Sequence, residues 1–71
     1  MRLKALVSKD DEIKWLVIES DEDDTNGYFI YYHLDDNNAW DSWHKTLEGA
    51  LESAHVQYGI MKESWEALND T

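Results

Sequence analysis

The fold is decided by the stretch Trp40–Ile60, WDSWHKTLEGALESAHVQYGI, in which two tryptophans and a histidine lead into an amphipathic segment. Thr46 stands where a helix N-cap is expected, because its hydroxyl can accept a hydrogen bond from a backbone N–H that has no partner within the helix. Gly59 supplies the left-handed residue that ends many helices. Between them lies an apolar stripe at helical spacing, formed by Leu47, Ala50, Leu51, Ala54 and Tyr58. The sequence therefore predicts a helix between Thr46 and Gly59.

Upstream of this helix, apolar runs alternate with polar turns, a pattern typical of strands joined by short loops. The runs cover residues 3–7, 13–19 and 28–34, with a weaker fourth at 39–44. The turns are rich in Asp and Asn, and the Asn26-Gly27 pair is a strong turn signal. Downstream, a short second helix is expected from about Lys62, with Met61, Trp65 and Leu68 on one side.

These elements predict an α+β protein, in which an antiparallel meander of three to four strands is followed by two C-terminal helices packed on one face. The 71 residues make a single small domain, residues 1–71, with room for one core. Four Trp and four Tyr supply the large side chains that so small a core needs.

One face of the sheet is expected to stay uncovered, because two short helices cover only one side. The run at residues 13–19 is apolar on both of its faces. We therefore expect an apolar and aromatic patch on the uncovered face, lined by Leu6, Leu16, Ile18 and aromatic residues of the third strand such as Tyr31. Such patches often mark interaction sites. The alternative is that Lys and Arg stems and the acidic loop cover this face.

The chain is strongly acidic, with 16 acidic and six basic residues and a formal charge of −10. Direct binding to nucleic acid is disfavoured, since phosphate contacts draw on clustered Lys and Arg. A basic protein partner, or high solubility alone, accounts for the surplus. The absence of Cys fits the cytoplasm, and no apolar run approaches the roughly 18–20 residues of a membrane span.

The loop after the second strand concentrates carboxylates at Asp21, Glu22, Asp23 and Asp24. Its start imitates a calcium loop, but the twelfth position, which requires a bidentate Glu, is His33. The loop is instead a candidate surface for a basic partner. The three histidines lack ligand spacing and no Cys supplements them, so no metal or other cofactor is expected.

Trp40, Trp43 and His44 lie at the junction between strand and helix. The two tryptophans are three residues apart and point to opposite faces of a strand, so one of them is a candidate interface anchor. His44 lies near Asp41, which could orient it as an acid or a base. No nucleophile motif accompanies it, and packing is the commoner role for a histidine in this place.

The segment W43-H44-x-T46-L47-x-x-A50-x-x-x-A54-x-x-x-Y58-G59-I60, followed by Trp65, resembles the C-terminal half of small uncharacterised bacterial proteins that have a strand-rich first half. The resemblance covers about a third of the chain and consists of capping and core residues. It implies a fold and no activity.

Three functions remain open at this point. We favour a non-catalytic protein-binding module, not an enzyme, with a second copy of the chain among the candidate partners. The first alternative is an acidic inhibitor, either an immunity-type protein or a mimic of DNA phosphates, that binds a basic partner. The second is a small enzyme built on His44 and Asp41, which needs a pocket that 71 residues hardly enclose.

Overall fold

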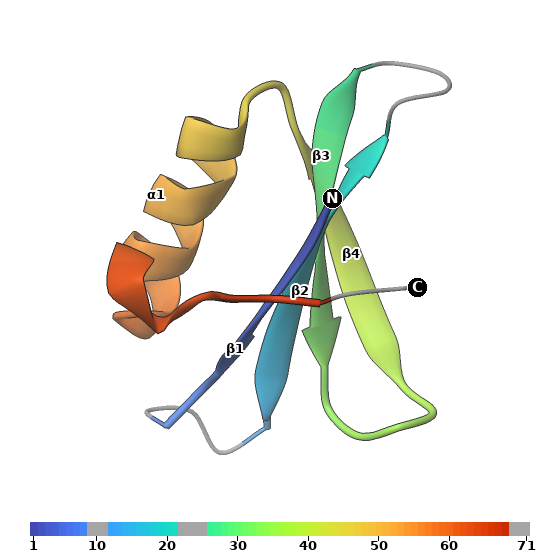
Figure 1. Ribbon diagram of the computed structural model, residues 1–71. Coiled ribbons are helices and arrows are strands. Elements are labelled where there is room, and N and C mark those ends of the chain that lie inside the picture. The colour runs from blue at the N-terminus through green and yellow to red at the C-terminus, as the bar shows by residue number, and fades with distance from the viewer. Residues whose placement is uncertain (9–11, 22–25, 69–71) are drawn as a thin grey trace.

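The computed structural model describes residues 1–8, 12–21 and 26–68, which form an antiparallel sheet with one α-helix on one face (Figure 1). Its strands are β1 (Arg2–Leu6), β2 (Trp15–Asp21), β3 (Gly27–His33), β4 (Ala39–His44) and β5 (Glu66–Ala67). They lie in the order β4-β3-β2-β1-β5, and every neighbouring pair is antiparallel. The helix α1 spans Leu47–Tyr58, and a 3-10 turn, η1, spans Lys62–Ser64.

Helix α1 begins after Thr46 and ends before Gly59, the two capping residues that the sequence predicts. The Thr46 hydroxyl accepts a hydrogen bond from the Gly49 N–H at 3.0 Å. Gly59 has a positive φ of 70°, and its N–H donates to the His55 carbonyl at 2.8 Å. A residue with a Cβ adopts that conformation only at a cost, which is why a glycine ends the helix here. The predicted helix between Thr46 and Gly59 is confirmed.

We call the side of the sheet that α1 covers the inner face. Side chains alternate between the two faces along a strand, and neighbouring strands align residues of the same face. The inner face and α1 enclose a core of Ala5, Ile13, Leu16, Ile18, Ile30, Tyr32, Ala50, Ala54 and Ile60. The helix contributes two alanines to this core, and such short side chains let its backbone lie close to the sheet. Each buried Ile or Leu contributes about 1.5–3 kcal/mol.

The turn between β3 and β4 is held by Asp35. One of its carboxylate oxygens accepts the backbone N–H of Asn37 at 2.8 Å and that of Asn38 at 2.9 Å. The bond from the Asn37 N–H, followed by the bonds from Asn38, lowers the pKa of the Asp35 carboxyl. This turn places His33 opposite Ala39, which sets the register of the whole β3–β4 pair.

The predicted architecture, with three to four strands and two C-terminal helices, is wrong in its last part. Between residues 59 and 68 only η1 is helical, and the chain is extended again at Trp65, with φ −78° and ψ 133°. Glu66–Ala67 then pair with β1 as a fifth strand, and the Leu68 N–H donates to the Arg2 carbonyl at 2.8 Å. A helix this short gains little from its own hydrogen bonds, whereas the edge of β1 offers a partner to each residue. The described residues form an α+β fold with five strands and one α-helix.

The prediction that Leu16 and Ile18 line the uncovered face is also wrong. Both are fully buried in the core under α1, and Trp15 and Val17 point to the opposite side of the sheet. Strand β2 is apolar on both faces, so alternation alone does not decide which set faces the helix.

The N-cap allows a direct test of the helix boundary. Thr46→Ala removes the acceptor for the Gly49 N–H and is expected to lower the free energy of unfolding by about 1 kcal/mol, while Thr46→Ser retains most of it. Thermal unfolding followed by circular dichroism should show a decrease in the midpoint of about 4–8 °C for the alanine variant. Equal midpoints for the two variants would show that the cap contributes nothing.

Candidate functional site

The outer face of the sheet, opposite α1, carries no helix of the described chain (Figure 1). The registers of the strands place Arg2 beside Glu19, Lys4 beside Val17, and Leu6 beside Trp15. Across β3 and β4, the same face continues with Phe29, Tyr31, His33, Asp41 and Trp43. This face combines aromatic rings with charges of both signs, and its two halves differ.

At the end of the outer face where β1 ends and β2 begins, side chains of the sheet cover the surface. The rings of Trp15 and His33 stack at a centroid distance of 4.9 Å with an interplanar angle of 9°. The Lys4 ammonium lies over the Trp15 ring, 5.1 Å from its centroid. Val17 lies between these groups and Tyr31 in the registers of the strands, and only 6% of its surface is exposed. Lys4 thus covers part of this face, in line with the alternative that Lys and Arg stems and the acidic loop cover it.

The other half of the outer face is aromatic and negatively charged. The rings of Phe29 and Tyr31 lie 5.9 Å apart and are tilted by 32°. Asp41 is the cross-strand neighbour of Tyr31, and Trp43 is the neighbour of Phe29. We call this surface the acidic aromatic patch, and it consists of Glu19, Asp21, Phe29, Tyr31, Asp41 and Trp43.

The phenol of Tyr31 reports the electrostatic field of this patch. Burial raises its pKa above the ordinary value, and the negative charges of Glu19, Asp41 and Asp21 raise the pKa further. These three carboxylates come from two strands, one on each side of β3. The field at Tyr31 therefore favours a positive charge placed against its ring.

Trp43 lies across the start of β3. A Cβ added to Gly27 would overlap the Trp43 indole, so the ring rests directly on the glycine backbone. An aromatic side chain placed over a glycine in the neighbouring strand covers backbone that would otherwise be exposed. The indole still exposes 45% of its surface, so it can contact the glycine and a partner at the same time.

Replacing Gly27 tests this contact. Gly27→Ala is expected to push the Trp43 ring off the strand and to lower the free energy of unfolding by about 1–3 kcal/mol, as overpacking does elsewhere. Tryptophan fluorescence of a variant with Trp15, Trp40 and Trp65 changed to Phe should shift to longer wavelength when Ala replaces Gly27. An unchanged spectrum would contradict the contact.

The field at Tyr31 is testable by titration. The phenol of the folded protein should titrate above 10, which can be followed by NMR of ring-labelled tyrosine. Because the pKa is raised in the folded state, the neutral phenol favours folding below pH 10, and this contribution is lost as the pH rises through the folded-state pKa. Asp41→Asn should lower the midpoint. Asp36→Asn, which makes the same charge change in the exposed β3–β4 turn, should leave it unchanged.

The second junction tryptophan points the other way. Trp40 pairs with Tyr32 on the inner-face side of β4 and exposes 59% of its surface. His44 is on that side too, whereas Asp41 is on the outer face, so the predicted Asp41–His44 pair does not form. Instead the Ser42 hydroxyl lies 2.9 Å from His44 Nε2 and 2.7 Å from the Tyr32 hydroxyl. This chain of hydrogen bonds joins β3 to β4.

A serine beside an imidazole nitrogen is the contact that activates serine nucleophiles. Here the Ser42 oxygen is held from its other side by Tyr32, a side chain that is 8% exposed. None of these three residues lines the groove between α1 and η1 or the pocket that includes Lys4, Leu6 and Ser64. The arrangement accounts for His44 as a structural residue.

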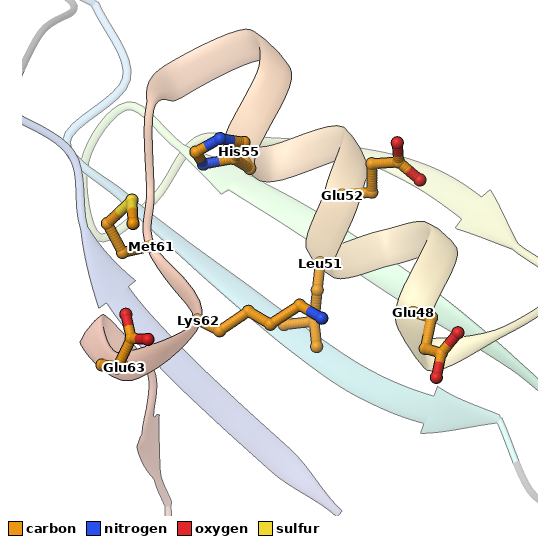
Figure 2. A pocket seen from close by; sticks show the side chains of 7 residues that line it. All are labelled: Glu48, Leu51, Glu52, His55, Met61, Lys62 and Glu63. Carbon is orange, nitrogen blue, oxygen red and sulfur yellow. The ribbon is translucent and has the colours of Figure 1, made fainter.

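A separate groove of about 410 Å³ lies between α1 and η1 (Figure 2). It is lined by Glu48, Leu51, Glu52, His55, Met61, Lys62 and Glu63. His55 Nδ1 lies 3.3 Å from the Ile60 carbonyl, which orients the ring beside Met61. Figure 2 shows Lys62 extending from η1 toward Leu51. Within the described part of the chain, no three His, Asp or Glu side chains are grouped to hold a metal ion.

The residues singled out from the sequence are dispersed in the structure. Asp21, Tyr31 and Trp43 belong to the acidic aromatic patch, while Leu6 is on the same face and is 74% exposed. Trp40 and His44 lie on the other side of β4. Glu22, Asp23 and Asp24 lie outside the described residues.

Three members of the patch were missed as binding candidates. They are Glu19, Phe29 and Asp41. Phe29 shares a face with Tyr31 by simple alternation, which the sequence does show. Glu19 and Asp41 join them only through the registers of β2 and β4 with β3.

No family model matches the chain, and the comparisons with curated proteins and with solved structures likewise give no match. The resemblance to small bacterial proteins therefore stays a prediction. Among residues 1–8, 12–21 and 26–68, no helix is long and apolar enough to cross a membrane.

Proposed function

We propose that this chain is a non-catalytic protein-binding module that binds a basic partner through the acidic aromatic patch. The observation that carries the proposal is the position of Tyr31, a partly exposed ring with negative charge from Glu19, Asp21 and Asp41 around it. A cytoplasmic location belongs to the same proposal.

The chemistry of the patch suits an arginine or a lysine of the partner. A cation over an aromatic face gains roughly 0.5–1 kcal/mol at exposed sites and about 2 kcal/mol where water is excluded. The protein makes such a contact itself on the neighbouring half of the face, where Lys4 lies over Trp15. Carboxylates beside the rings add ion pairing, and the net charge of −10 steers basic partners toward the protein.

A basic protein is a better partner for this patch than a second copy of the chain. Two copies meeting through their patches would bring like carboxylates together and would oppose net charges of −10. The acidic inhibitor is a special case of the same proposal, in which the basic partner is a toxin or a DNA-binding protein.

The test uses two acetylated and amidated peptides, one alternating glycine and arginine and the other with citrulline in place of arginine. Citrulline keeps the shape of arginine without its charge. The arginine peptide should shift the amide resonances of β3 and β4 in labelled protein, with weaker binding at higher salt. The citrulline peptide should shift none of them.

Matched variants locate the binding. Trp43→Ala and Asp41→Asn should each weaken binding of the arginine peptide by about five- to tenfold, the range of one lost cation contact of about 1 kcal/mol. Trp40→Ala, on the opposite side of the same strand, and Asp36→Asn, in the β3–β4 turn, are the controls and should bind as the native protein does. Equal weakening by both aspartate variants would show that only net charge matters, and the proposed site would be wrong.

A further inference from the structure

We infer that the basic partner enters as an extended segment that adds a strand to the open edge of β4, antiparallel to it. This inference rests on the proposed function and specifies how the partner is held. It follows from the position of β4 in the sheet, from the direction of its backbone groups and from the side chains on its two faces.

Strand β4 is one of the two edges of the sheet, and no described strand lies beyond it. The other edge is β5, which is only two residues long. Strand β4 has six residues, Ala39–His44, and each is aligned with a residue of β3 without a bulge. It contains no Pro or Lys, the residues with which proteins commonly protect an edge.

The direction of the β4 backbone groups follows from the ladder. In an antiparallel pair, residues that exchange hydrogen bonds alternate with residues whose N–H and C=O point away from the partner. The Leu34 N–H donates to the Asn38 carbonyl at 3.0 Å, so the hydrogen-bonded residues of β4 continue at Trp40 and Ser42. The backbone groups of Ala39 and Asp41 therefore point toward the open edge.

The hydrogen bonds between β1 and β2 independently support this assignment of which β4 residues face the open edge. The Ser20 N–H donates to the Met1 carbonyl at 3.1 Å and the Val7 N–H donates to the Lys14 carbonyl at 2.9 Å. Counting outward from these pairs across β2 and β3 gives Ala39 and Asp41 the same orientation, toward the open edge. Hydrogen bonds at both ends of the sheet thus agree on which residues of β4 face the open edge.

The side chains flanking this edge define the chemistry of the added strand. On the outer face, Asp41 and Trp43 belong to the acidic aromatic patch, so the added strand needs Lys or Arg on that side. On the inner-face side stands the exposed Trp40, which suits an apolar side chain. Successive residues of a strand point to opposite faces, so the fitting segment alternates basic and apolar residues.

The edge-facing backbone groups of Ala39 and Asp41 also determine which N–H groups of the added strand face β4. Directly opposed residues in an antiparallel pair have side chains on the same face. The residues opposed to Ala39 and Asp41 are therefore the basic ones, and their N–H groups donate to β4. The N–H groups of the apolar residues point away from the protein.

The test compares three synthetic heptapeptides of alternating lysine and valine that begin and end with lysine. The first is unmodified, the second is N-methylated at two inner lysines and the third is N-methylated at two valines. We expect the lysine-methylated peptide to bind at least about tenfold more weakly than the other two, because each blocked N–H removes a hydrogen bond of about 1 kcal/mol and its methyl group holds the strands apart. Any other order of affinity overturns the inference.

A variant of the protein provides the second test. Ala39→Pro removes an N–H that points away from β3, and a proline is tolerated at such a place on an edge strand. Binding of the unmodified lysine–valine peptide should weaken by about fivefold, the loss of one hydrogen bond, relative to Ala39→Ser. Peptide-bound native protein should also protect the Asp41 amide from hydrogen exchange. An unchanged exchange rate at Asp41 overturns strand addition.

The outcomes separate this inference from the proposed function. If all three lysine–valine peptides bind equally while Asp41→Asn weakens them and Asp36→Asn does not, the patch binds a basic partner without strand addition. If Trp40→Ala weakens the lysine–valine peptide and leaves the arginine–glycine peptide unaffected, the apolar side of the added strand is confirmed. Dimerisation of the free protein through β4, seen by sedimentation at low micromolar concentration, would show that a second copy is the occupant and would overturn the inference.

Discussion

The structure depends on a strand that is buried on both sides. In β2, Leu16 and Ile18 pack beneath α1, and Val17 packs beneath the side chains of the outer face. The described part of the chain has a single α-helix, which covers one side of this strand, so the other side is covered by side chains of the sheet itself. The long side chains of β1 and β3 provide that cover. Their arrangement on the outer face is a consequence of the need to bury Val17.

This requirement explains why the two halves of the outer face differ. Where β1 ends and β2 begins, Lys4 lies over the Trp15 ring and Trp15 stacks on His33, so these side chains cover the surface. Near β4, the rings of Phe29 and Tyr31 have carboxylates as neighbours, and the sheet ends after one more strand. In this second half Glu19 also pairs with Arg2 at 3.9 Å, and an exposed pair of this kind contributes little stability, on the order of 0–1 kcal/mol. One half of the face is thus covered by its own side chains, and the other half is the surface on which the proposed function rests.

The sequence predicted the helix well because its two ends carry residues with specific backbone roles, Thr46 and Gly59. It also located β4, which follows a turn rich in Asp and Asn. It did not predict β5, because pairing with β1 overrides the weak helical pattern after Lys62. The facing of β2 was inverted, because both of its sides are apolar. Tyr31 and Trp43 were identified as candidates, but their grouping with Asp41 required the β3–β4 register that the Asp35 turn imposes.

Because the edge of β4 is open, the large negative charge of the protein also opposes aggregation through that edge. A regular, unprotected edge strand is a template for the growth of fibrils, in which each copy adds its own strand to the last. With a net charge of −10 on so small a body, long-range repulsion keeps copies apart before their edges can meet. That protection vanishes near the isoelectric point, at about pH 4.3, where the carboxylates are partly neutralised. The acidity on which the proposed binding of a basic partner rests would therefore also keep the open edge from pairing with other copies.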